Sequence, residues 1–383
     1  MIDRDYYLSL CIDAQKNLEY YKTEAERKVI KWEYTSGKRY DITPFWFERN
    51  QEPVAKVRKQ ETSSKYGLDE SGNVWVAAFD SSTDIIGYRS QDEQGIINRL
   101  YRSDGRLDSI QHMTIINGLP THYVEFIVRM GSTLDTVWHY EEHYKYEDRM
   151  LNHISREYWS NLGPRGRQYQ VQYNYEFHIS YDEDGSLSQI HDNHQKIIYV
   201  RMSKQKVIAL REEVKTGLVE DAKDVFQEIH RKTGSERLCF VAIYLHQSSS
   251  YIYDPVYHPG LERIRTEQLE QKLTPDILWS SGEHPSDYQE SIQNEELGRK
   301  LERLVQYWQM KNNWWKEGKR LWYDVVQELN LQDWSGILPI TDDFVIYVDE
   351  EALNVKKGDL AKSIPSNKVD VLYAKGLLST IKK

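Results

Sequence analysis

The chain has 383 residues, of which 39% are hydrophobic and 29% charged, and its formal net charge is −10. This length suggests two or three domains, and 28 Tyr with 11 Trp supply enough buriable surface to exclude a disordered chain. The acidic balance argues against nonspecific nucleic-acid binding, which needs a basic surface, and it favours a basic protein partner. Cys11 and Cys239 lie far apart in the sequence, so no disulfide framework or zinc knuckle is expected.

No stretch approaches about 18 uninterrupted apolar residues, and the first residues lack a signal-peptide core. We therefore expect a cytoplasmic protein that does not interact with membranes. The sequence calls for no cofactor, and it leaves the oligomeric state open.

The first thirty residues have the apolar spacing of helices, with Leu8, Ile12 and Leu18 roughly on one face. Residues 30–205 then change to β-branched and aromatic runs separated by turn residues. The clearest strand is 169–181, in which apolar or aromatic residues occupy every second position over thirteen residues. A sheet with one wet face is normally antiparallel, so this part is predicted to be an antiparallel β-meander.

A ten-residue pattern occurs twice, as "YRSDGRLDSI" at 101–110 and as "YDEDGSLSQI" at 181–190. Glycine tolerates a positive φ, and aspartate bonds its own backbone, so an Asp-Gly pair suits a hairpin turn. Only one carboxylate beside each glycine recurs, which is too few for a calcium loop. The repeat is interpreted as hairpin geometry, with a looser third copy at Gly72.

After about residue 205 the pattern becomes mixed α and β. Helices are predicted at 217–234 and 260–273, and a longer helical stretch at 294–329 is divided by Gly318. Buried strands are predicted at 237–245 and 343–350, followed by a closing helix with Pro365 near its start. The fold class is therefore α+β. The two predicted domains are 1–205, a helix with an antiparallel sheet, and 206–383, a mixed α/β domain.

The segment "HYEEH", residues 139–143, fits the H-x-x-E-H pattern of zinc proteases, which needs both histidines on one helical face. The surrounding residues alternate as in a strand, where His139 and His143 would lie about 13 Å apart. Two interpretations stay open. In the first, a metal is held by His139, Glu141 and His143. In the second, these residues belong to a polar sheet face rich in His and Glu.

Four carboxylates surround the predicted strand 343–350, namely Asp342, Asp343, Asp349 and Glu350. Such residues can hold a divalent cation, act as acid and base, cap a helix, or form an acidic binding rim, and the rim or cap is favoured.

The loop "LWSSGEHPSDY" adds Trp279 and His284 as candidate binding residues. A Ser-His-Asp set that uses Ser248, Ser249 or Ser250 can be imagined, but no G-x-S-x-G motif supports it.

From residue 217 onward the order of elements resembles an uncharacterised bacterial domain family. A helix precedes the buried strand "CFVAIYL", and a Trp-containing loop, a Trp-bearing helix, "TDDFVIYV" (341–348) and a final helix follow. Members of that family are proposed to act as immunity proteins beside polymorphic toxins. The resemblance implies toxin neutralisation and no catalytic residue. Residues 1–200 show no such likeness.

We therefore expect a non-enzymatic binding protein, an immunity protein that covers a basic toxin domain. One alternative is a metal-dependent hydrolase that uses the His-rich sheet or Asp342 and Asp343. Another is a non-catalytic subunit of an antiphage defence system.

Overall fold

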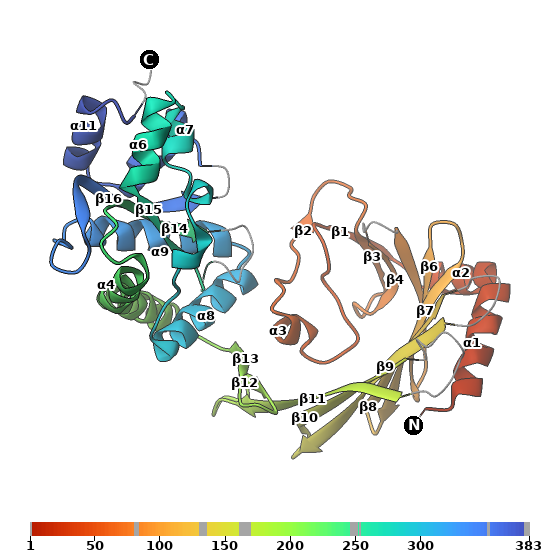
Figure 1. Cartoon of the computed structure of the whole chain (residues 1–383). Helices are drawn as coiled ribbons and strands as arrows, with labels where there is room; N and C mark the ends of the chain where they lie inside the picture. The colour runs from red at the N-terminus through yellow and green to blue at the C-terminus, as the bar shows by residue number, and fades with distance from the viewer. Residues whose placement is uncertain are drawn as a thin grey trace. The chain divides into compact units, whose positions relative to one another are not determined.

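The computed structural model describes residues 2–79, 84–129, 136–160, 170–245, 252, 254–350 and 353–378. The chain divides into two compact units, which we call unit 1 (Met1–Arg201) and unit 2 (Met202–Lys383). Unit 1 combines helices with a large antiparallel sheet, and unit 2 combines helices with a small mixed sheet (Figure 1). The predicted α+β class is confirmed.

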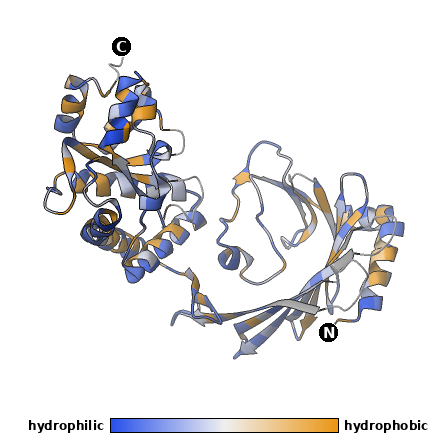
Figure 2. Cartoon of the chain, in the orientation of Figure 1, coloured by the Kyte–Doolittle hydropathy of each residue, from blue (hydrophilic) through white to orange (hydrophobic). Residues whose placement is uncertain are grey.

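Unit 1 begins with two helices, α1 (Arg4–Lys16) and α2 (Leu18–Glu26). Asp3 caps α1 by accepting a hydrogen bond from the backbone N–H of Tyr6, which satisfies one of the free donors at a helix start. Tyr7, Cys11 and Ala14 recur at helical spacing and are buried against the sheet. In Figure 2 the helices show the mixture of hydrophobic and hydrophilic residues that this one-sided burial requires.

The described residues of unit 1 form a 13-stranded sheet in the order β13-β12-β11-β10-β9-β8-β7-β6-β5-β4-β3-β1-β2, so that β3 to β13 follow one another as a meander. Every pairing is antiparallel, as predicted. The strands are β1 (Lys31–Thr35), β2 (Val57–Arg58), β3 (Lys65–Leu68), β4 (Val74–Phe79), β5 (Ile85–Gln91), β6 (Gly95–Arg102), β7 (Leu107–Ile116), β8 (Leu119–Arg129), β9 (Thr136–Glu147), β10 (Met150–Ser160), β11 (Gln170–Tyr181), β12 (Leu187–Asp192) and β13 (Ile197–Val200).

The two faces of this sheet are covered by different segments. Helices α1 and α2 lie on its outer side, and the segment that contains the short helix α3 (Trp46–Asn50) lies on its inner side (Figure 1). Neighbouring residues of β8 accordingly enter different cores, with Val124 in the cluster that includes Tyr7 of α1 and Tyr123 in the cluster that includes Phe45. The sequence pattern did not predict α3 inside the β region.

The two Asp-Gly copies close hairpins in the same way. In the β6–β7 turn, Arg102 N–H donates to the carbonyl of Arg106, and Gly105 N–H donates to the carbonyl of Arg102. The β11–β12 turn has the same two bonds, from Asp182 N–H to the carbonyl of Ser186 and from Gly185 N–H to the carbonyl of Asp182. Gly105 and Gly185 have φ of +80° and +74°. The turn at Gly72 has the same bonds, and so does the turn at Gln195, which takes the left-handed position without being glycine.

Unit 2 has a three-stranded sheet in the order β15-β14-β16, antiparallel between β14 and β15 and parallel between β14 and β16. Alternate residues of β14 enter opposite cores: Val241 and Ile243 face the cluster of α4, α8 and α9, and Phe240 and Ala242 face the cluster of α7, α10 and α11. The elements are α4 (Lys204–Thr233), β14 (Leu238–Leu245), β15 (Val256–Leu261), α6 (Glu262–Glu270), α7 (Pro275–Leu278), η1 (Ser281–Glu283), η2 (Ser286–Tyr288), α8 (Glu295–Met310), α9 (Trp314–Leu329), β16 (Ile340–Glu350), η3 (Val355–Lys357), α10 (Asp359–Ser363) and α11 (Ser366–Ala374).

The division of the long helical stretch differs from the prediction. The chain leaves the helix at 311–313, where Asn312 has a φ of +54°, and not at Gly318. Gly318 is buried within α9, and a Cβ built there would lie 2.6 Å from Ile252 Cγ2. The glycine therefore allows close packing inside a continuous helix, a role that a single sequence does not distinguish from a helix break.

Candidate functional site

The predicted acidic strand is β16, and its carboxylates separate into two groups at opposite ends. Asp342 and Asp343 lie near its start. Arg265 Nη2 donates to Asp343 Oδ1 at 2.8 Å, and Lys375 Nζ lies 2.8 Å from Asp342 Oδ1 and 3.2 Å from Asp343 Oδ2. Burial raises the pKa of Asp343, but the hydrogen bonds and charges of its partners outweigh this and lower it overall. Through these contacts, Asp342 and Asp343 connect β16 to α6 and to the residue that follows α11.

At the other end of β16, Asp349 and Glu350 line a cavity of about 550 Å³ together with His284, Ser281 and His258. Ser281 Oγ donates to Asp349 Oδ2 at 2.5 Å across 68 residues of sequence. Glu350 is held by Lys319 Nζ at 2.9 Å. The structure thus brings three predicted binding residues together, and it adds Ser281, which the sequence did not single out.

Burial shifts the pKa of two groups that line this cavity, Asp349 and His284, in the direction that favours their neutral forms. Burial raises the pKa of Asp349 to about 6 despite its hydrogen bonds from Ser281. Burial lowers the pKa of His284 to about 4, and its Nδ1 accepts a hydrogen bond from the backbone N–H of Leu261 at 3.0 Å. Because Ser281 bonds the carboxylate directly, this arrangement differs from a Ser-His-Asp relay. The serines considered for such a relay, 248–250, lie outside the described residues.

Trp279 is a core residue and does not line this cavity. Its side chain is fully buried, its Nε1–H donates to the carbonyl of Leu377 at 3.0 Å, and its own carbonyl accepts from the hydroxyl of Tyr347. It therefore fastens the end of the described chain onto the sheet of unit 2.

A second hollow of about 720 Å³, which we call the acidic groove, lies between α4 and α8. Its charged residues are six carboxylates and one lysine: Glu212, Glu213, Glu220, Asp221, Asp224, Glu296 and Lys300. Lys300 Nζ binds Glu213 at 2.8 Å and Glu296 at 2.9 Å, and Asp221 accepts from the backbone N–H groups of Gln293 and Asn294 before α8. The acidic residues Glu213, Glu220 and Asp224 recur at helical spacing along one face of α4. This spacing was the available signal, and the sequence reasoning missed it.

The helices approach closely at one point of this groove. A Cβ built on Gly217 would lie 2.7 Å from Leu297 Cδ1, so a larger residue there would push α4 and α8 apart. Gly217 thus permits the close contact between the two helices that line the groove.

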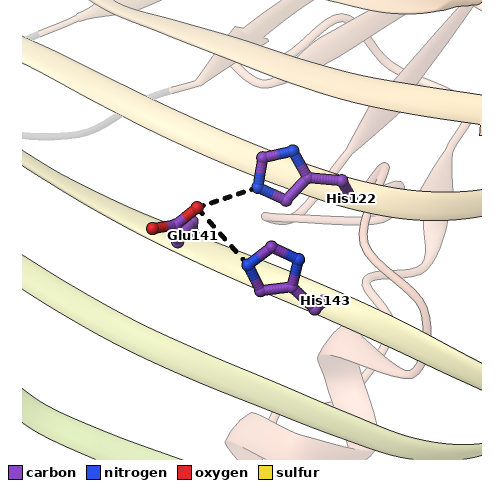
Figure 3. Close-up of side chains that lie close together, drawn as sticks. All are labelled: His122, Glu141 and His143. Carbon is purple, nitrogen blue, oxygen red and sulfur yellow. Dashed lines mark hydrogen bonds and ion pairs between the residues drawn. The ribbon is translucent and has the colours of Figure 1, made fainter. Parts of the chain in front are cut away.

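In unit 1 the "HYEEH" segment lies in β9, as the strand interpretation predicted. His143 and Glu141 face His122 of β8 (Figure 3). His122 Nε2 lies 3.0 Å and His143 Nε2 3.4 Å from the same oxygen, Glu141 Oε2, and the two imidazole rings are stacked with centroids 4.5 Å apart. Burial raises the pKa of Glu141, but the two histidine contacts outweigh it and hold the value well below the usual range.

His139 is not part of this cluster. It is buried between Phe126 and Trp159, whose rings stack on it with centroids at 6.2 Å and 6.0 Å, and burial lowers its pKa to about 4. The extended spacing of β9 separates it from His143, and the third residue of the cluster comes from the neighbouring strand.

None of the helices in the described ranges is both long and apolar enough to cross a membrane. Comparison of the chain with protein-family models, with curated proteins and with solved structures gave no match in any of the three.

Proposed function

We propose that this chain is a non-enzymatic binding protein that neutralises a basic toxin domain by direct contact. The resemblance of residues 217–383 to a family of proposed immunity proteins suggests this role. The structural observation that supports it is the acidic groove, in which six carboxylates face one lysine. Opposite charge on the partner would speed association and penalise wrong partners.

The groove has charge that is available to a partner. The side chains of Glu212, Glu213 and Glu296 are 55%, 56% and 68% exposed, so their charges face solvent. Lys300 pairs with Glu213 and Glu296, and Arg211 and Lys215 pair with Glu212, so these charges are partly compensated. Asp221 is different, because it is buried and serves the start of α8. The partner would therefore meet the exposed glutamates and leave Asp221 to hold the groove together.

The experiment is a pull-down from the native host with wild-type protein and a double charge reversal, Glu213→Lys with Glu220→Lys. The matched control is Glu267→Lys with Glu270→Lys, two exposed acidic positions on α6. We expect wild type and control to retain one basic protein in a one-to-one complex. At low salt the groove variant should retain clearly less of this protein than wild type, because reversed charges slow the encounter of the two proteins by about tenfold or more. Added salt should narrow this difference because it screens exposed charges.

Equal binding by the groove variant, or retention of an acidic partner only, would contradict the proposal. A subunit of an antiphage system would instead be retained with several other subunits in fixed proportion. The hydrolase alternative depends on a bound metal, and the cluster around Glu141 is the observation that favours it.

A further inference from the structure

We propose that His122, Glu141 and His143 bind a first-row transition-metal dication, with Zn²⁺ the best match to the donor set. Two imidazole nitrogens and one carboxylate oxygen are ligands that zinc accepts, and three protein ligands leave a fourth position for water. This inference is independent of the acidic groove, which belongs to unit 2.

The donor atoms already converge. His122 Nε2 and His143 Nε2 both approach Glu141 Oε2, and one ligand atom from each residue lies within 4.8 Å of the others. Ligand atoms around a tetrahedral zinc with bonds near 2.0–2.1 Å lie about 3.3 Å from one another. Small rotations of these three side chains would reach that spacing without moving the backbone.

The backbone fixes this arrangement through strand register. His122 of β8 is the direct cross-strand partner of His143 of β9. Glu141 precedes His143 by two residues, so both side chains leave β9 on the same face. A site built on paired strands is held more precisely than one built on loops.

Burial of the Glu141 carboxylate favours the binding of a cation beside it. Glu141 is 1% exposed, and its Oε1 has no hydrogen-bond partner among the described residues. An ionised carboxylate removed from water is costly unless a cation or hydrogen bonds compensate it. The side chains of His122 and His143 are 27% and 48% exposed, so an ion has a path from solvent to the buried oxygen.

The same construction recurs two strands away. Glu176 and His178 of β11 repeat the Glu-x-His spacing, and His153 of β10 is the cross-strand partner of His178. There both imidazoles lie 3.9 Å from Glu176 Oε2, and the glutamate side chain is 40% exposed. Because its contacts are longer and its carboxylate is already solvated, this second cluster should bind a metal more weakly. It provides an internal comparison for the first.

The test uses the full chain without a polyhistidine tag, freed of metal with a chelator and titrated with Co²⁺. Visible absorption reports the coordination of Co²⁺, and competition by Zn²⁺ gives the relative affinity. His143→Ala and Glu141→Gln each remove one proposed ligand. His178→Ala is the matched control, because it removes the equivalent histidine from the second cluster.

We expect wild type and His178→Ala to bind one tight equivalent with the absorption of low-coordinate Co²⁺. His143→Ala and Glu141→Gln should weaken that equivalent by at least about tenfold, the low end of the loss seen even for residues that only support a ligand. Circular dichroism establishes that each variant is folded. His143 is half exposed, and glutamine keeps the shape of the buried glutamate, so at least one variant should pass this check.

Two results would overturn the proposal. One is the lack of a Co²⁺ band in wild type at concentrations well above those of the protein. The other is an unchanged tight equivalent in the folded His143→Ala and Glu141→Gln variants, which would place the metal elsewhere. Loss of the tightly bound Co²⁺ only in His178→Ala would likewise overturn the proposal, because it would place the metal in the second cluster.

Discussion

Both units bury a carboxylate on a strand, and they neutralise it in different ways. In unit 1, Glu142 is fully buried. Arg49 Nη1 lies 2.7 Å from its Oε1, Arg156 Nε donates to it at 2.6 Å, and the Tyr144 hydroxyl donates at 2.7 Å. Burial raises the pKa of Glu142, but the two arginines outweigh it and bring the value to about 2.

In unit 2, Asp349 has hydrogen bonds from Ser281, and in the described part of the chain no ion pair with a cation is found for it. Its pKa rises to about 6. The difference shows how a buried carboxylate acquires its role. Glu142 is a fixed charge that fastens the α3 segment onto the sheet, whereas Asp349 changes its protonation near neutral pH.

The largest expected effect comes from breaking the cluster at Glu142. Glu142→Gln leaves Arg49 and Arg156 close together and buried without their counter-charge. Removing one partner of a buried ion pair costs about 3–5 kcal/mol, so the free energy of unfolding of unit 1 should fall by that amount. Urea denaturation followed by circular dichroism measures it. Glu183→Gln, at an exposed turn, is the control, and a loss in the Glu142 variant no larger than in the control would contradict this account.

The second prediction concerns the pH dependence of unit 2. The folded pKa of Asp349, about 6, lies above its ordinary value of 3.8, so folding takes up a proton between these values. The protonated aspartate contributes fully to stability below about pH 4, and this contribution is lost as the pH rises through 6.

Asp349→Asn keeps a neutral acceptor for Ser281 at every pH. The variant should gain about 2.5 kcal/mol of unfolding free energy relative to wild type between pH 4 and pH 8. Denaturation curves of variant and wild type at the two pH values measure the difference in their unfolding free energies. The other titrating groups contribute equally to both proteins and cancel in this difference. A constant difference between variant and wild type would show that Asp349 stays charged in the folded state.

The third prediction asks whether Trp279 serves the core or a partner. Trp279→Phe removes the indole donor from the carbonyl of Leu377 and leaves that buried acceptor unpaired. We expect a loss of about 1–3 kcal/mol in the free energy of unfolding. Capture of the partner by the folded variant should be unchanged, whereas weaker capture at equal stability would make Trp279 a contact residue.

The smallest expected loss of stability comes from substitutions at the hairpin turns, which carry no buried charge. Gly105→Ala and Gly185→Ala each place a Cβ on a residue in the left-handed region, which costs about 1–2 kcal/mol. The neighbourhood is open in both, since the nearest atom to a Cβ at 105 is Leu18 Cδ2 at 3.5 Å and none lies within 4 Å at 185. Equal losses in thermal denaturation are expected, and clearly unequal losses would mean that the two turns differ in more than backbone strain.

The local pattern of the sequence determined much of the fold. Alternation over 169–181 predicted β11, and the two Asp-Gly copies predicted their hairpins, because a period of two and a positive φ are properties of a few adjacent residues. Apolar spacing also predicted helices in the first thirty residues, but the buried face of α1 carries Tyr7, Cys11 and Ala14, and Ile12 of the expected face is exposed. Gly318 misled because a glycine that permits close packing and one that ends a helix look alike in sequence.

Only the tertiary structure decided which functional groups meet. His122 reaches His143 because β8 and β9 pair in one register, and a shift of one residue would turn the two side chains to opposite faces. Ser281 meets Asp349, and Glu296 joins the glutamates of α4, through packing between segments far apart in the chain. Residue types and their spacing set which elements form and which faces are polar, and the register and packing of those elements set the distances between the side chains.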